Sequence, residues 1–277
     1  MFIPQKELHM SALPDVRELF ALSDLMLRTA GLNLVTTLVV VKDDDILQSK
    51  TGWSGGKPEQ ESRAPMIGPM KAIEVYLEML ETGRDFVMTP TTRALEHYKF
   101  MGGVGQRVHP DYAYIASGSA WDQRCDALWA LMLLYAMQHE VMLHHVGFRH
   151  SSMEKTLSAI AADQYRHNGW SVEKNVSGQM RSYLKIEVPD APVYYVEHQY
   201  FYPKASGYTT QLAQEAIHWD LVTPDPVGFL NFVAEKLGTQ ATFWDDAGEN
   251  DPVGVIWEQN RDGVHYGFMA RSQWWEI

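Results

Sequence analysis

Apolar positions recur at helical spacing in some segments of the chain and at strand spacing in others. Val16, Leu19 and Leu27 follow the helical period and Gly31 ends the run, so a first helix is predicted there. The β-branched run 35–41 is continuous and predicts a strand buried on both faces. Helices and strands are interleaved in this way along the whole chain, which predicts an α+β fold.

The longest apolar pattern runs from Ser119 to His145. Its middle, Leu128 to Tyr135, is apolar nearly all round, as expected for a buried helix. We therefore predict one long helix over about 119–145, with the other helices and mainly antiparallel strands built around it.

The remaining elements follow from the same rules of period and punctuation. Further helices are predicted at about 69–81, 91–100, 151–167, 211–216 and 226–237, and strands near 107–117, 182–188, 193–201, 241–244, 253–258 and 264–269. The glycine- and proline-rich stretch 48–69 is predicted to be a loop, and 260–263 a hairpin turn. No internal repeat is evident. We predict a helix-rich lobe at 1–149 and a second α+β lobe at 150–277, which could also form one continuous domain.

Composition narrows the range of partners. The 277 residues are 45% hydrophobic and carry a formal net charge of −12. Because binding to a phosphate backbone depends on clustered Lys and Arg, nucleic acid is not an expected ligand. A basic protein, a cationic small molecule or a metal fits the charge better.

Cysteine use and apolar runs bear on location. Cys125 is the single cysteine, so an internal disulfide is excluded and a reducing cytoplasm is the expected compartment. The N-terminal stretch lacks a basic segment followed by an apolar run, so no signal peptide is predicted. The apolar stretch 127–137 is about half of the ~20 residues that a membrane helix needs, so no membrane association is predicted.

Acidic and tryptophan residues concentrate in the last quarter of the chain. Between positions 207 and 277 there are eleven acidic and three basic residues, together with five tryptophans. The turn-rich segment DDAGENDP supplies the most compact acidic group. The candidate partner-binding residues are Trp244, Asp245, Asp246, Glu249, Asp251 and Trp257.

This acidic end favours a protein-binding function. Aromatic side chains anchor protein interfaces, and a field of one sign steers an oppositely charged partner. The chain resembles bacterial immunity proteins in general character, being acidic, α+β and without a catalytic motif, although it matches no motif of theirs. We predict a cytoplasmic inhibitor that neutralises a basic partner such as a toxin, a binding protein in preference to an enzyme and with no cofactor.

A histidine cluster supports an alternative, metal-dependent hydrolysis with zinc or iron. His139, Glu140, His144 and His145 form the candidate ligand set, and HEVMLH resembles the helix of zinc peptidases. In that helix the two histidines lie four residues apart, whereas His139 and His144 are five apart, about 140° round a regular helix. A metal could bind both only if the helix were distorted.

Cys125 supports a second alternative, cysteine-dependent hydrolysis. It lies in the first turns of the predicted long helix, where the helix dipole favours a thiolate. His218 and Asp220 in the HWD run could complete such a site, and this run resembles the His-aromatic-acid sequence of transglutaminase-like enzymes. The glycines of MGGVGQR at 101–107 lack the spacing of a phosphate-binding loop and are interpreted as a helix stop and turn.

Overall fold

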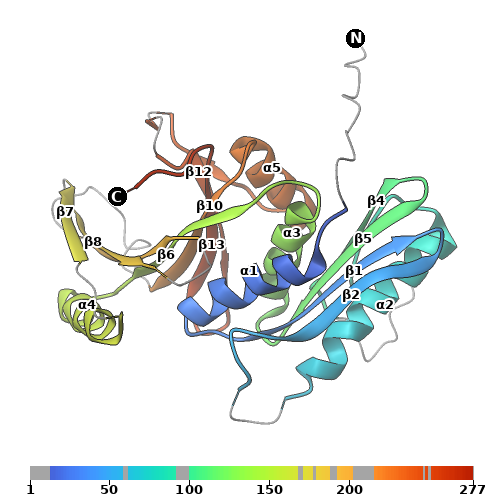
Figure 1. The fold of residues 1–277 in the computed structure, drawn as a ribbon, viewed down its shortest axis with the longest axis horizontal. Coiled ribbons are helices and arrows are strands. Elements are labelled where there is room, and N and C mark those ends of the chain that lie inside the picture. The colour runs from blue at the N-terminus through green and yellow to red at the C-terminus, as the bar shows by residue number, and fades with distance from the viewer. Residues whose placement is uncertain are drawn as a thin grey trace.

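The structure is a computed structural model in which residues 13–58, 62–91, 100–167, 171–176, 179–187, 192–201, 215–245, 247–248 and 251–276 are described. Two β-sheets lie on either side of a group of helices (Figure 1). The fold is α+β with mainly antiparallel strands, as the periodicity predicts.

The first sheet contains five antiparallel strands in the order β2-β1-β5-β4-β3. Its elements are α1 (Val16–Thr29), β1 (Leu34–Lys42), β2 (Asp45–Ser54), α2 (Ala64–Thr82), β3 (Phe86–Met88), β4 (Gly103–His109) and β5 (Tyr112–Ser119). Asp15 caps α1 by accepting hydrogen bonds from the backbone N–H groups of Arg17 and Glu18. Asp43 and Asp44 both adopt positive φ between β1 and β2, which is the geometry of a tight hairpin turn.

The second sheet contains eight strands in the order β11-β12-β13-β10-β6-β9-β8-β7. Its elements are β6 (Met142–Arg149), α4 (Met153–His167), β7 (Ser171–Val176), β8 (Gln179–Ile186), β9 (Tyr194–Phe201), β10 (Ala216–Val222), α5 (Pro226–Leu237), β11 (Thr242–Phe243), β12 (Gly254–Gln259) and β13 (His265–Arg271). The described elements therefore form two units of the same order, strand-helix-strand-strand-strand. In each unit the first strand pairs in parallel with the last, and antiparallel β6 and β10 join the units. This repeat is one of topology and not of sequence, which is why no internal repeat is evident in the sequence.

The main core lies between the two sheets. Helix α2 covers one face of the first sheet, while α1 and α3 (Gln123–Ala136) pack between its other face and the second sheet. Trp129 of α3, Trp219 of β10 and Phe268 of β13 are fully buried there and contact one another. These aromatic contacts fix the back of the second sheet against the helices.

The predicted long helix over 119–145 is wrong. Helix α3 begins after the cap Asp122 and ends at Ala136, and β6 follows from Met142. Beyond Met137 the sequence alternates, with Leu143 and Val146 directed to the core and His145 to the other side. The strand period therefore replaces the helical one at the point where the polar stretch QHE interrupts the apolar run.

Two predicted loops are also corrected. The stretch 48–69 contains most of β2, an exposed edge strand without an apolar face, and the start of α2. The glycines of 101–107 lie in and before β4, where they allow close packing: a Cβ on Gly105 would lie 2.5 Å from Cγ1 of Val75 in α2.

The strand β10 was not predicted. The predicted helices at 91–100 and 211–216 fall largely outside the described residues.

Other elements agree with the sequence. The helix predicted at 151–167 is α4, and the side chain of Ser152 accepts a capping hydrogen bond from the N–H of Lys155. No helix among the described residues is long and apolar enough to cross a membrane. The change from one sheet to the other falls between β5 and β6, and the division into lobes at 149/150 stays a prediction.

Candidate metal centre

Three ionisable side chains meet on the face of the second sheet that lies opposite its helices. They are His145 of β6, Glu197 of β9 and His218 of β10, and these three strands are neighbours at the centre of the sheet. The side chains of all three are at least 95% buried. A buried cluster of this kind needs pairing or a bound ion to be stable.

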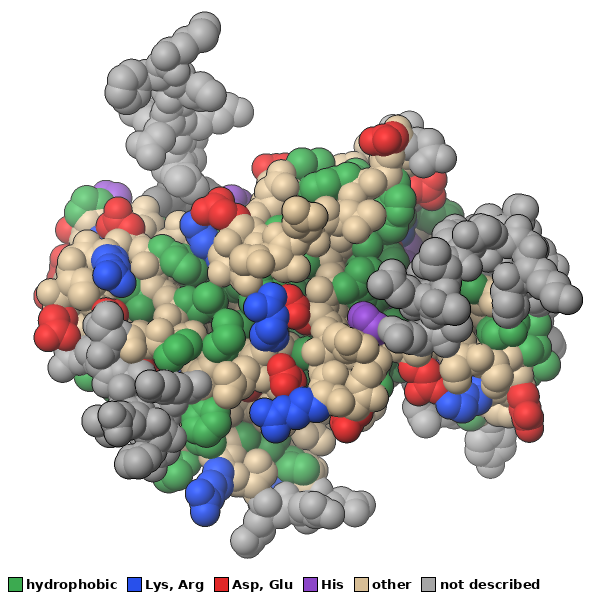
Figure 2. Space-filling model, turned by 180° about the vertical axis from the view of Figure 1, so that it is seen from behind, with side chains coloured by type: hydrophobic (Ala, Val, Ile, Leu, Met, Phe, Trp, Pro, Cys, Tyr) green, Lys and Arg blue, Asp and Glu red, His purple; other side chains and the backbone are tan. Residues whose placement is uncertain are grey.

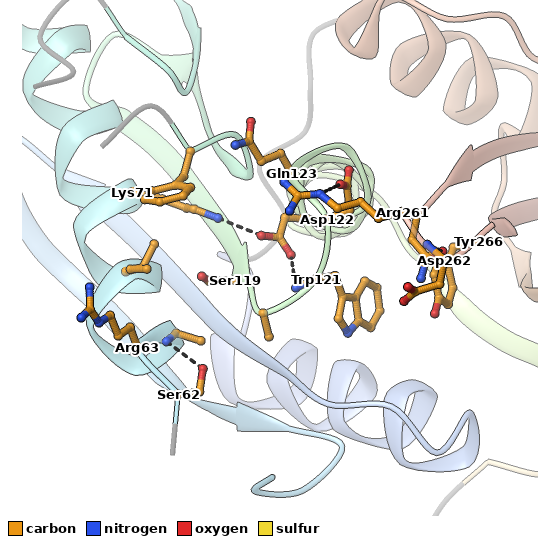
Figure 3. A pocket seen from close by; sticks show the side chains of 16 residues that line it. Ser62, Arg63, Lys71, Ser119, Trp121, Asp122, Gln123, Arg261, Asp262 and Tyr266 are labelled. Atoms are coloured by element: carbon orange, nitrogen blue, oxygen red, sulfur yellow. Dashed lines mark hydrogen bonds and ion pairs between the residues drawn. The ribbon is translucent and has the colours of Figure 1, made fainter. Parts of the chain in front are cut away.

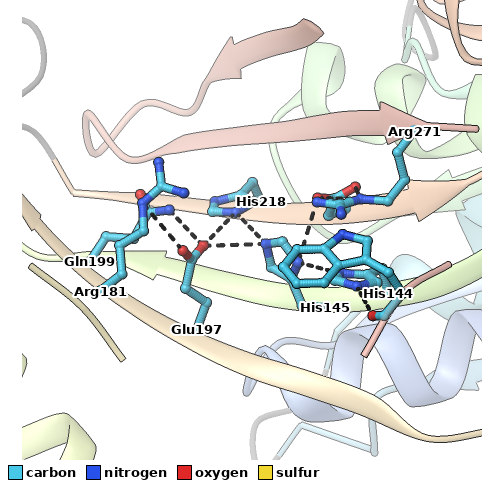
Figure 4. Close-up of polar contacts among 9 residues, drawn as sticks. His144, His145, Arg181, Glu197, Gln199, His218 and Arg271 are labelled. Atoms are coloured by element: carbon cyan, nitrogen blue, oxygen red, sulfur yellow. Dashed lines mark hydrogen bonds and ion pairs between the residues drawn. The ribbon is translucent and has the colours of Figure 1, made fainter. Parts of the chain in front are cut away.

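The three ligand atoms form a nearly equilateral triangle (Figure 4). Nε2 of His145 lies 3.1 Å from Nε2 of His218, and Oε2 of Glu197 lies 3.2 Å from each of these nitrogens. Ligand atoms that each lie about 2.1 Å from one metal ion are about 3.0 Å apart at right angles and about 3.4 Å apart in the tetrahedral geometry that zinc prefers. The triangle therefore has the dimensions of one face of a metal coordination sphere.

Glycine residues on the neighbouring strands make room for His218. In the register of the sheet, Gly147 of β6 and Gly267 of β13 lie on either side of it. A Cβ on Gly147 would lie 2.0 Å from Cε1 of the His218 ring, and a Cβ on Gly267 would lie 2.3 Å from the Trp257 ring, which contacts His218 edge-on. Gly147 thus leaves room for the His218 imidazole, and Gly267 leaves room for the Trp257 ring beside it.

Electrostatics keep the carboxylate charged and His218 neutral. Burial opposes ionisation of Glu197, but the adjacent His145 and His218, with Arg181 nearby, hold its pKa well below the usual range. Burial also lowers the pKa of His218, against the influence of Glu197. Nδ1 of His218 is buried with no hydrogen-bond partner among the described residues. This state, an anionic carboxylate beside a neutral imidazole, is the one that binds metal.

A bulge in β6 brings a third histidine, His144, beside the triangle. The pairing of β6 with β10 shifts by one residue at His144, so His144 and His145 contact each other, with their Nδ1 atoms 2.9 Å apart. Nε2 of His144 lies 3.0 Å from the backbone carbonyl of Trp275, which can only accept a hydrogen bond. Burial lowers the pKa of His144 to about 3, so at neutral pH its proton is on Nε2 and its Nδ1 is an acceptor.

This arrangement selects the tautomer of His145. Its Nδ1 faces two acceptors, Nδ1 of His144 at 2.9 Å and Oδ2 of Asp220 at 3.5 Å, and therefore carries the hydrogen. Asp220 is itself held by Arg271, whose Nε donates to both carboxylate oxygens at 3.0 and 3.1 Å. Nε2 of His145 is left with its lone pair directed at Glu197 and His218, as a metal ligand requires.

The carboxylate comes from one unit of the repeat only. In the first unit His145 pairs with Tyr195 and Glu197 follows two residues later; in the second, His218 pairs with Gly267 and Met269 follows two residues later. Met269 thus holds the position equivalent to Glu197. Two histidines and one carboxylate are the resulting ligand set.

A second buried polar group lies by a cavity of about 570 Å³ between α2, α3 and the turn after β12 (Figure 3). Nζ of Lys71 donates to Oδ2 of Asp126 at 3.0 Å and to the carbonyl of Gly118 at 2.7 Å. Oδ1 of Asp126 accepts from the backbone N–H of Trp121. Glycine again makes room, because a Cβ on Gly102 would lie 2.6 Å from Cβ of Asp126. This is a single pair of opposite charges.

The structure separates the four predicted metal ligands. His144 and His145 belong to the buried group, with His145 as a candidate ligand and His144 beside it. His139 and Glu140 are exposed in the turn after α3, where the His139 ring packs on Tyr135. The helical geometry assumed for HEVMLH does not exist here, since the histidines at 144 and 145 lie on a strand.

The surroundings of Cys125 do not favour a nucleophilic thiolate. It is fully buried in α3, and burial raises the pKa of its thiol to about 12. His218 and Asp220, its predicted catalytic partners, instead belong to the group on the second sheet.

The described candidates for partner binding differ in exposure. Trp244, Asp245 and Asp251 are exposed, and Asp251 accepts a hydrogen bond from the N–H of Gly248. Trp257 is half-buried and turned to the metal-site candidate. Asp246 and Glu249 lie outside the described residues.

Sequence reasoning missed Glu197 altogether and grouped His218 with Cys125 and not with His145. One signal was present: each interrupts a strongly apolar or aromatic strand, YYVEHQYF and AIHWDLV. An ionisable residue in a strand that is otherwise built for burial indicates a pairing partner or ligand.

Comparison with known proteins gives structural neighbours only. No family model and no curated protein matches the sequence. Methylmalonyl-CoA epimerase of Streptomyces coelicolor, solved with 2-nitronate-propionyl-CoA, aligns over 47% of this chain and 97% of its own, with 14% identity and a TM-score of 0.32. The epimerase of Mycobacterium tuberculosis covers 47% and 88%, with 14% identity and a TM-score of 0.30. A hypothetical protein of Bacillus halodurans covers 50% and 99%, with 14% identity and a TM-score of 0.29.

The prediction of an immunity-type inhibitor is wrong. Two of the three named neighbours are methylmalonyl-CoA epimerases, and none is an immunity protein. In this chain the ionisable groups that converge are buried residues of the second sheet, whereas Asp245 and Asp251 are exposed.

Proposed function

We propose that this protein is a metal-dependent enzyme whose divalent ion is bound by His145, Glu197 and His218. One observation carries the proposal: three buried ligand atoms from three adjacent strands lie 3.1–3.2 Å from one another. Their chemistry supports it too, since two imidazoles with an anionic carboxylate are a ligand set for zinc in hydrolases and for non-haem iron.

The neighbouring residues prepare the ligands for an ion. Asp220 and His144 hold the hydrogen of His145 on Nδ1, and Arg181, 3.7 Å from Oε1 of Glu197, keeps that carboxylate ionised. Tyr183 packs edge-on against the His145 ring. Orientation by such outer contacts is typical of catalytic metal centres.

Three protein ligands leave further coordination positions for water or substrate. An ion held there would act as a Lewis acid on a substrate oxygen or lower the pKa of a bound water. Metal-dependent hydrolysis is the reaction class to assay first, because a set of two histidines and one glutamate serves it in zinc enzymes. The cytoplasm stays the expected location.

The test is metal content together with matched variants. Protein purified without chelator should contain close to one zinc, iron or manganese ion per chain, and Glu197→Gln and His218→Ala should lose it. His139→Ala removes an exposed histidine outside the triangle and should keep the metal. Equal metal content in all four proteins would place the ion elsewhere, and folded protein that binds none of these metals would refute the proposal.

A further inference from the structure

Helix α2 has an apolar stripe on the side that faces away from the protein. Its inner side packs on the first sheet through residues such as Ala72, Val75 and Met79. The stripe consists of the large apolar residues Met66 (54% exposed), Met70 (39%), Ile73 (58%), Leu77 (39%) and Leu80 (44%). Figure 2, which shows the molecule from behind, has hydrophobic side chains gathered on this side.

The spacing of the stripe is that of a helix-pairing seam. Successive members are four, three, four and three residues apart, which is the pattern of the a and d positions in paired helices. The stripe extends over about 21 Å of helix. Single exposed apolar residues are ordinary, but a continuous row of five marks an interaction surface.

The seam is nearly symmetric about Ile73. Met66 and Leu80 each lie seven residues from it, and Met70 and Leu77 lie three and four residues away. When a second copy of the helix runs antiparallel across the first, Ile73 therefore faces Ile73 of the second copy. Met66 then faces Leu80 of the second copy, so the same surface complements itself, as a two-fold interface requires.

Charges beside the seam favour the antiparallel direction. Arg63 and Glu81 are exposed, flank the seam at opposite ends of α2 and lie eighteen residues apart, five helical turns, on the same side. In an antiparallel pair this side of one helix meets the same side of the other. Arg63 of each copy therefore faces Glu81 of the other copy. In a parallel pair, the side of α2 that carries Arg63 and Glu81 would instead meet the side of the second helix that carries Pro69 and Tyr76.

We propose that α2 is the interface of a two-fold symmetric homodimer, in which it packs antiparallel against α2 of a second copy. The interface joins the outer faces of the two first sheets and lies apart from the triangle on the second sheet. Dimerisation is thus independent of the proposed metal function, and Glu197→Gln should leave it unchanged.

Sedimentation velocity on a dilution series tests the interface. The wild-type protein should be a dimer that dissociates on dilution, and Ile73→Lys, which places two lysines together on the two-fold axis, should weaken association about 100-fold or more. Leu157→Lys on α4 is the control, because Leu157 is 51% exposed and outside the stripe. A wild-type monomer at all concentrations, or equal association of Ile73→Lys and wild type, would overturn the proposal.

Engineered cysteines test the direction. Cys125 is fully buried, so an introduced surface cysteine is the accessible thiol. Under oxidation Ile73→Cys should form a disulfide-linked dimer, whereas Leu157→Cys should not. A mixture of Met66→Cys and Leu80→Cys chains should cross-link to each other and neither alone, and cross-linking of each variant with itself would contradict the antiparallel arrangement. Arg63→Glu should weaken the dimer, and adding Glu81→Arg should restore it.

Discussion

Two groups of buried ionisable side chains lie beside different sheets of this molecule and differ in how their charges are paired. Beside the first sheet, Lys71 donates and Asp126 accepts, so a positive and a negative group neutralise each other. On the second sheet, His145, Glu197 and His218 direct three possible metal-ligand atoms at one point. The first group is a complementary pair of charges, whereas the second is a set of ligand-type atoms that suits a bound cation.

Both groups are made possible by glycine. Gly102 leaves room for Asp126 and Gly147 leaves room for His218, each at distances that a methyl group could not occupy. Room for a side chain is therefore not in itself a sign of function in this protein. The balance of donors and acceptors distinguishes a structural pair from a candidate ligand set.

The largest effect is expected from breaking the pair beside the first sheet. Lys71→Met leaves the Asp126 carboxylate buried without its partner and should lower the free energy of unfolding by about 3–5 kcal/mol. Adding Asp126→Asn removes the unpaired charge and should recover most of this loss. Urea denaturation of the three proteins measures both steps; if the double variant were no more stable than Lys71→Met, charge neutralisation would not be what the pair supplies.

Removing the carboxylate of the triangle should have a different outcome. Glu197→Gln takes away a buried charge and should change the stability of metal-free protein little, but should weaken metal binding at least about 100-fold. Glu276→Gln is the control, because it breaks only the exposed ion pair with Lys185. Calorimetric titration with zinc gives the affinities, and similar values for both variants would show that Glu197 is not a ligand.

Filling the space beside His218 should affect the triangle through geometry alone. A methyl group from Gly147→Ala would overlap the imidazole ring and displace it, at a cost of about 1–3 kcal/mol in stability and with weaker metal binding. Thermal unfolding with and without zinc reports both quantities. A variant that matched the wild type in both would mean that the ring position is not fixed by this contact.

Acid should destabilise the metal-free protein through the buried histidines. His144 has a pKa of about 3 in the folded protein and an unfolded value near 6.5, so the unfolded chain binds the extra proton between these values. Stability is therefore full above pH 6.5 and falls as the pH drops towards 3, by about 1–2 kcal/mol from this residue by pH 5. His144→Phe should flatten the unfolding free energy against pH in this window, and an unchanged slope would contradict the assignment.

The sequence predicts local elements well where one period dominates. α1, β1, α4, α5 and the hairpin 260–263 are confirmed because caps, β-branched runs and turn residues act locally. The helix over 119–145 fails because the apolar run of α3 continues into the core-facing residues of β6, and only the polar face of β6 reveals the change of period.

The candidate site depends on contacts that local patterns do not contain. His145, Glu197 and His218 are distant in sequence and meet because β9, β6 and β10 are neighbours in the sheet. The acidic C-terminal quarter attracted attention by composition, but Asp220 and Glu258 from it are buried in ion pairs with Arg271 and Arg124. Composition therefore overstates the charge available to a partner.

The most direct test of the account is zinc and iron binding by the metal-free wild-type protein beside Glu197→Gln. The account predicts one high-affinity ion per wild-type chain, with loss of the ion in the variant and no loss of fold. Binding of equal affinity in both proteins, or no binding by folded wild-type protein, would contradict the assignment of the triangle as a metal centre.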